Sequence, residues 1–96
     1  MDEEQIEESL KDIRLIKDVL GMDINHFERH KDFAMKGLMK FGDSFAYRLG
    51  ILLKSADLKN SVIILNIWKN ECTQHDLLYR IHQAKKEAEK NETLNS

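Results

Sequence analysis

Proline is absent from this 96-residue chain, which contains one cysteine, four glycines and one tryptophan. Because a single thiol cannot form an internal disulfide, the composition excludes a disulfide-rich scaffold and a cysteine-rich zinc module, and it favours a reducing, cytoplasmic location. The longest apolar run covers only residues 62–65, whereas a membrane-spanning helix needs about 20 apolar residues. The acidic start, MDEEQIEES, contains no apolar run, so we expect neither a secretory signal nor a transit peptide.

Hydrophobic residues make up 42% of the chain and charged residues 33%, as in an ordinary globular domain. Apolar positions recur at intervals of three and four residues almost everywhere, and no window alternates strictly between apolar and polar residues. This pattern predicts an all-α fold, a compact bundle of four to five helices. We expect a single helical domain over residues 1–90 and a flexible C-terminal tail over residues 91–96.

Short polar residues and glycine mark where the helices begin and end. Asp23 and Asp57 are expected N-caps, and Asp43 or Ser44 starts the helix between them, because these side chains accept hydrogen bonds from free backbone N–H groups. Gly21 stands where a left-handed residue ends the first helix. The expected helices cover residues 3–20, 24–41 and 44–55, and a fourth begins at residue 58.

The apolar pattern changes phase after Cys72. Residues 73–76, Thr-Gln-His-Asp, have the form of a capping box, so we expect a break near Thr73 and a fifth helix that ends near Lys90. The alternative is one helix over residues 58–90, about 50 Å long. Such a rod would project from the domain, and its apolar end would need a partner chain.

Charge is distributed unevenly along the chain. Residues 1–12 carry six acidic side chains against one lysine, and residues 13–70 are mildly basic. Such an acidic head suggests attraction to the basic body, within one chain or between two chains. The alternative is that acidic residues simply favour the first turn of a helix, where the macrodipole is positive.

Two histidine-containing pairs have metal-ligand spacing: His26 with His30, and Cys72 with His75. Together they would form a Cys-His₃ set for Zn²⁺. Cys72 would also be a candidate nucleophile if His75 or His82 served as its base. Since no nucleophile elbow, phosphate loop or glycine-rich cradle accompanies these residues, we favour a buried structural thiol and a partly exposed histidine pair. We therefore predict a protein that is not an enzyme and has no cofactor.

Basic residues are frequent between positions 29 and 59, which favours a nucleic-acid-binding regulator as an alternative function. The segment 49–69 has the length of two short helices around a turn, but its second half is dominated by apolar residues that do not read base edges. The sequence pI of about 6.1 also differs from that of a typical DNA-binding module. The candidate nucleic-acid-binding residues are Arg29, Lys31, Lys36, Lys40, Arg48, Lys54 and Lys59.

Apolar residues cover more than one face of the fourth helix, which indicates either a central helix at residues 62–68 or a partner-binding surface. Ala46 and Gly50, four apart, form a notch where another helix can approach closely. We predict a helical protein–protein interaction module with a protein partner, self-association as a homodimer and no membrane contact. The residues expected to supply core and contact are Phe45, Leu49, Ile64, Ile67, Trp68, Leu78 and Ile81.

The middle of the chain carries the pattern Phe41-Gly42-Asp43, then Ala56-Asp57-Leu58-Lys59-Asn60, then Trp68. This pattern resembles small helical proteins of unknown function that are carried by phages and other mobile elements. The chain departs from them in lacking proline beside the aromatic residues. The resemblance covers residues 41–68, transfers no catalytic residue, and implies an accessory protein in the host cytoplasm that binds and modulates a host factor.

Overall fold

Four of the helices begin directly after an aspartate. In the computed structural model, which describes residues 2–95, the helices are α1 (Glu3–Leu20), α2 (Ile24–Phe41), α3 (Ser44–Ser55), α4 (Leu58–Ile67) and α5 (Lys69–Asn95). Asp2, Asp23, Asp43 and Asp57 each accept a hydrogen bond from the backbone N–H three residues later, at 2.7 to 3.0 Å. Each carboxylate thus satisfies a backbone donor that the helix leaves free. The predicted all-α bundle is confirmed, and the first three helices have the predicted bounds.

Gly21 ends α1 in the left-handed region, with φ of 68°. Its N–H donates to the carbonyl of Lys17 at 2.9 Å, which is the predicted helix ending. Because Gly has no Cβ, it adopts this conformation without the steric penalty that other residues incur.

The break before the last helix lies at Trp68, five residues earlier than predicted. Trp68 has φ of −101° and ψ of 38°, outside the helical region. Its N–H still donates to Ile64, and its carbonyl still accepts from Cys72. Since the backbone groups stay paired through the bend, the bend needs no capping side chain and leaves no cap signal in the sequence. Residues 58–95 therefore form two helices that meet at one residue.

The expected capping box at residues 73–76 is wrong. Thr73 is exposed within α5, and the carboxylate of Asp76 is buried against α2 rather than bound to a nearby backbone N–H. Instead, one face of α5 is buried and includes Cys72, His75 and Asp76. This burial outweighs the capping-box signal, because packing against another helix contributes more stabilising free energy than a single cap.

The second helix, α2, is the centre of the bundle. Helices α3 and α5 both pack against α2, while α1 packs mainly against α4. Residues 62–68 are not enclosed on most sides, because Ile63, Ile67 and Trp68 remain exposed. The core cluster consists of Ile16, Phe27, Ala34, Leu38, Ala46, Leu49, Leu53, Val62, Ile64, Leu65 and Cys72.

Glycines allow α3 and α5 to approach α2 closely. A Cβ on Gly37 would overlap the backbone carbonyl of His75 on α5, and a Cβ on Gly50 would lie 2.7 Å from Cγ of Met39 on α2. Gly50 of the predicted notch thus lies at the α3–α2 contact, and Ala46 of that notch is also buried. The Gly37 contact carried no comparable signal, because nothing local distinguishes it from other helical glycines.

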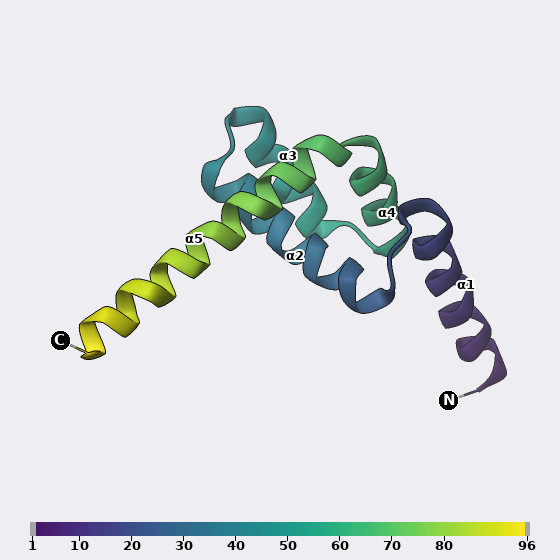
Figure 1. The fold of residues 1–96 in the computed structure, drawn as a ribbon. Coiled ribbons are helices and arrows are strands. Elements are labelled where there is room, and N and C mark those ends of the chain that lie inside the picture. Colours follow the sequence, from purple (N-terminus) through teal and green to yellow (C-terminus); the bar gives the residue numbers. More distant parts are fainter. Residues whose placement is uncertain (1, 96) are drawn as a thin grey trace.

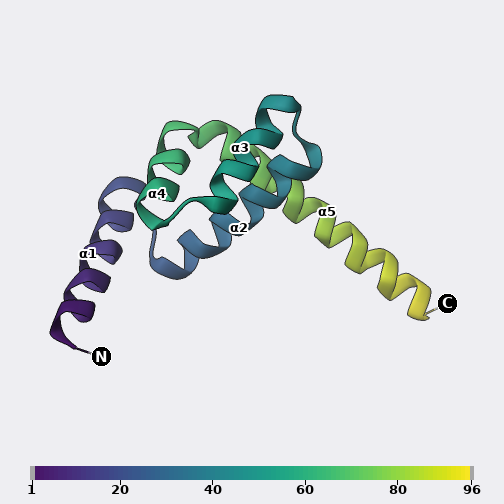
Figure 2. The same cartoon turned by 180° about the vertical axis from the view of Figure 1, so that it is seen from behind.

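Two helical arms extend beyond this core. Figures 1 and 2 show the N-terminal half of α1 and the C-terminal half of α5 leaving the bundle at opposite ends. The radius of gyration is 16.0 Å, against about 13 Å for a compact domain of this size. The difference reflects the arms, in which residues 3–10 and 84–91 are exposed.

The end of the chain is helical through Asn95, so residues 91–95 continue α5. The flexibility predicted for residues 91–96 stays a prediction, and Ser96 lies outside the described residues. Within residues 2–95, no helix combines the length and apolar character that crossing a bilayer requires.

Candidate partner-binding surfaces

The structure divides the seven predicted core and contact residues into two groups. Leu49 and Ile64 are only 5% and 8% exposed and belong to the core, so they are unsuited to direct contact with a partner. The other five are between 39% and 66% exposed: Phe45, Ile67, Trp68, Leu78 and Ile81.

Phe45 and Trp68 form an exposed aromatic pair. Their rings meet edge to face with centroids 5.0 Å apart, joining the start of α3 to the bend between α4 and α5. Ile67 beside them is 66% exposed. Further along α5, Leu77, Leu78 and Ile81 are also exposed at spacings that place Leu77 and Ile81 on the same side of the helix.

A second surface, here named the lysine groove, lies across α2, α3 and α5. It is an open depression of about 470 Å³ with a largely apolar lining. Two methionines and two tyrosines line it, together with three lysines. The lining residues are Met35, Lys36, Met39, Lys40, Tyr47, Lys54 and Tyr79.

Interactions within the chain fix part of this groove. Lys36 forms an ion pair with Asp32 at 3.0 Å and lies 5.8 Å from the ring centre of Tyr79. The hydrogen bond and the charge of Asp32 raise the pKa of Lys36. Tyr79 accepts a hydrogen bond from Gln83 at 2.6 Å and packs against Phe33. One wall is therefore held in place, while the methionine side chains can adapt to a ligand.

The seven candidate nucleic-acid-binding residues do not gather on one surface. Three line the lysine groove, but Lys31 donates to the carbonyl of Ala56 at 3.1 Å, close to the α3–α4 connection. Lys59 lines a separate cleft. Arg29 and Arg48 are exposed outside both sites. The basic surface predicted from residues 29–59 is thus divided among several parts of the molecule.

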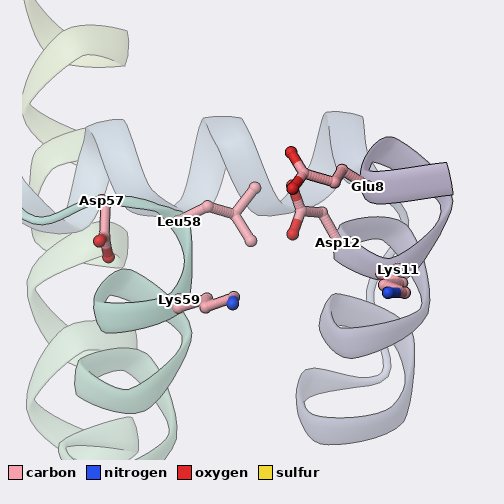
Figure 3. A pocket seen from close by; sticks show the side chains of 6 residues that line it. All are labelled: Glu8, Lys11, Asp12, Asp57, Leu58 and Lys59. Atoms are coloured by element: carbon pink, nitrogen blue, oxygen red, sulfur yellow. The ribbon is translucent and has the colours of Figure 1, made fainter. Parts of the chain in front are cut away.

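The separate cleft, of about 390 Å³, lies between α1 and α4. Figure 3 shows Leu58 extending from α4 toward α1, with Glu8 and Asp12 on the facing side. Lysines and acidic residues alternate around it, since Lys11, Asp57 and Lys59 complete the lining. Because charges of both signs line the same small space, this cleft presents no single charge to a ligand.

A buried histidine–aspartate contact joins α2 to α5. Nδ1 of His30 lies 2.6 Å from Oδ2 of Asp76, and Nε of Arg80 donates to Oδ1 of the same carboxylate at 2.5 Å. Arg80 also lies 4.9 Å from the ring centre of Phe33. Sequence reasoning missed this role of Asp76, because its partner His30 is 46 positions away and no short motif connects them.

The four candidate metal ligands do not converge. Although His30 and His75 are buried, His26 is exposed, and Nδ1 of His75 hydrogen-bonds the carbonyl of Glu71 at 2.8 Å. Among residues 2–95, no three or more His, Cys, Asp or Glu side chains group as a metal site would require. His30 is instead engaged with Asp76.

Cys72 is fully buried. Burial, followed by the nearby charge of Glu71, raises the pKa of its thiol to about 11. At neutral pH the thiol therefore stays protonated, whereas the thiolate is the nucleophilic form. This environment matches the structural role that the sequence favours for Cys72.

Comparison with known proteins gave no match to any protein-family model, curated protein or solved structure. The resemblance of residues 41–68 to phage-encoded proteins therefore stays a prediction. The function of the chain is therefore inferred from the surfaces described above.

Proposed function

We propose that this chain is a non-enzymatic protein–protein interaction module that binds an acidic amphipathic helix of a protein partner in the lysine groove. The observation that carries the proposal is the composition of this depression: an apolar methionine and tyrosine surface with three lysines around it. An amphipathic helix can place its apolar side on such a surface and its acidic residues beside the lysines.

The chemistry of the groove supports a protein ligand in two ways. Apolar burial favours association by about 25 cal/mol per Å², from which the lost translational, rotational and side-chain freedom is subtracted. Met35 and Met39 can repack around different side chains. Lys40 and Lys54 are exposed, so they contribute charge complementarity and faster association rather than most of the binding energy.

Nucleic acid is the second candidate, because tyrosines beside lysines also suit stacked bases and phosphates. Two observations favour protein. The predicted basic residues are divided among separate sites, and the chain carries a net charge of −2. A nucleic-acid site needs several phosphates neutralised along a continuous path.

The test is a titration of the full chain with a synthetic acidic amphipathic peptide unrelated to its own sequence. We expect the methyl signals of Met35 and Met39 in NMR spectra to shift, while that of Met22, outside the groove, stays in place. The variant Lys40→Glu/Lys54→Glu should weaken binding about tenfold or more, because like charges then face each other.

Oligothymidine provides the comparison arm of this titration. If the oligonucleotide shifts Met35 and Met39 and the peptide does not, the groove is a nucleic-acid site and the proposal fails. A steep loss of oligonucleotide binding with salt would identify that alternative.

A further inference from the structure

The N-terminal half of α1 carries an apolar stripe that remains about half exposed in the described part of the chain. Ile6, Leu10 and Ile13, spaced by four and three, are 46%, 51% and 42% exposed. Farther along the same helix, Ile16 is fully buried. The first three turns of α1 thus form an amphipathic helix with its apolar residues in solvent.

Acidic residues accompany this stripe. Glu3 and Glu7, four residues apart, follow one side of it, because at 100° per residue both fall within about 60° of Leu10. Glu4 and Glu8, also four apart, lie on the opposite side of the helix, where Glu8 lines the cleft with α4. The apolar stripe and its acidic neighbours therefore give the start of α1 the composition of the acidic amphipathic helix that we propose the lysine groove binds.

We propose that the lysine groove of one molecule binds the N-terminal half of α1 from a second copy of the chain. This inference rests on the proposed function and names the partner. Ile6, Leu10 and Ile13 would pack on the methionines and tyrosines, and Glu3 and Glu7 would lie beside Lys40 and Lys54. Both surfaces are unoccupied by other elements of residues 2–95, and their charges are opposite.

The N-terminal half of α1 cannot fill the lysine groove of its own molecule. The second half of α1 is anchored by Ile16 and packs mainly on α4, whereas the groove lies on the later part of α2, on α3 and on α5. Figures 1 and 2 agree that α1 points away from the rest of the bundle. Reaching its own groove would therefore require α1 to leave the core.

Each copy carries one α1 arm and one lysine groove. Two copies that exchange arms use both surfaces of each, so the contact closes as a dimer with two equivalent interfaces. Raising the ionic strength from about 0.05 M to about 0.5 M should weaken the dimer, because exposed charge pairs are screened.

The experiment measures the mass of the full chain across a dilution series by sedimentation equilibrium. We expect a monomer–dimer equilibrium that both Glu3→Lys/Glu7→Lys and Lys40→Glu/Lys54→Glu weaken about tenfold or more. Combining the two double variants in one chain should restore dimerisation, because the charges are then exchanged rather than made alike.

Two matched controls accompany these variants. Glu4→Lys/Glu8→Lys makes the same charge change with the same spacing on the other side of α1, and Lys86→Glu/Lys90→Glu reverses two exposed lysines outside the groove. Both controls should dimerise like the wild type. Circular dichroism establishes that every variant remains helical.

Three outcomes overturn the inference: a monomer at all concentrations, a dimer that the groove variant does not weaken, or equal weakening by a test variant and its control. If the chain is a monomer but the unrelated acidic peptide still shifts Met35 and Met39, the proposed function stands and only self-recognition fails. If neither binds, the proposed function fails as well.

Discussion

The contact between α2 and α5 and the first half of α1 are both built from amphipathic helix, yet they differ in what their apolar sides meet. Along α2, Gly37 lets α5 approach so closely that a Cβ would overlap a backbone carbonyl. Along α1, Leu10 is 51% exposed. Helical periodicity therefore identifies a surface suited to burial, but it does not indicate whether the same chain buries that surface.

The largest effect is expected at the closest packing. Gly37→Ala should lower the free energy of unfolding by about 3 kcal/mol or more, since the added Cβ overlaps the rigid carbonyl of His75 and forces α5 outward. Denaturant unfolding measures this loss, and alkylation of Cys72 should become faster because the buried thiol follows opening of the core.

Gly50→Ala is the matched control for this substitution. The nearest atom to its new Cβ is Cγ of Met39, a flexible side chain, so we expect a smaller loss of stability than at Gly37. Equal losses in the two variants would contradict the idea that the α2–α5 contact is the tighter one.

The next largest effect is expected at the buried carboxylate of Asp76. Asp76→Ala should cost about 3 kcal/mol, because it removes the carboxylate that pairs His30 and Arg80 and leaves His30 buried without this partner. Thermal unfolding of the variant checks the value. Substitution of Asp32, whose ion pair with Lys36 is exposed, should cost less than about 1 kcal/mol.

In the N-terminal half of α1, replacing apolar side chains by serine should leave the fold intact. Ile6→Ser/Leu10→Ser should alter the unfolding free energy of the dilute monomer by less than about 0.5 kcal/mol, since both residues are exposed on the surface of α1 and lie outside the core cluster. It should nevertheless weaken self-association. Ile16→Ser on the same helix, where the side chain is fully buried, should destabilise by several times more.

The smallest expected effect concerns His82. The ring of His82 packs against that of Phe41, with ring centres 5.3 Å apart. Burial lowers the pKa of His82 below its ordinary 6.5. The charges of Lys40, Lys86 and Lys85 lower this pKa further, and the charge of Glu89 opposes them. As pH falls through 6.5, the unfolded state takes up the proton first, so the contribution of His82 to stability decreases.

The free energy of unfolding, measured at pH 7.5 and at pH 5.5, tests whether His82 contributes less stability at the lower pH. His82→Gln should lose less stability than the wild type over that interval, because glutamine does not titrate. A larger loss in the variant would mean that the folded state favours protonated His82. An NMR titration of the imidazole in the folded chain gives the direction of the pKa shift independently.

Local chemistry explains why so much of the fold was predictable. The N-caps at Asp23, Asp43 and Asp57 and the helix end at Gly21 each depend on hydrogen bonds spanning three or four residues. Such signals can be read directly from the sequence. The bend at Trp68 could not be predicted this way, because its backbone groups stay paired and no cap marks it.

The candidate surfaces were less predictable. Lys36, Lys40 and Lys54 were among the predicted basic residues, but Tyr47, Tyr79 and the two methionines beside them were not assigned to that surface. They come from three helices and meet only when α3 and α5 pack on α2. Likewise, Phe45 and Leu49 share one helical stripe, and only packing leaves the first exposed and the second buried.

Capping and periodicity act over a few neighbouring residues, so the amino-acid order is sufficient to predict the all-α class, the starts of four helices and the acidic, amphipathic character of α1. Packing between helices is required for the bend at Trp68, the pairing of His30 with Asp76 and the assembly of the lysine groove. Those features depend on contacts between residues far apart in the chain, and their energies arise only when the helices pack together.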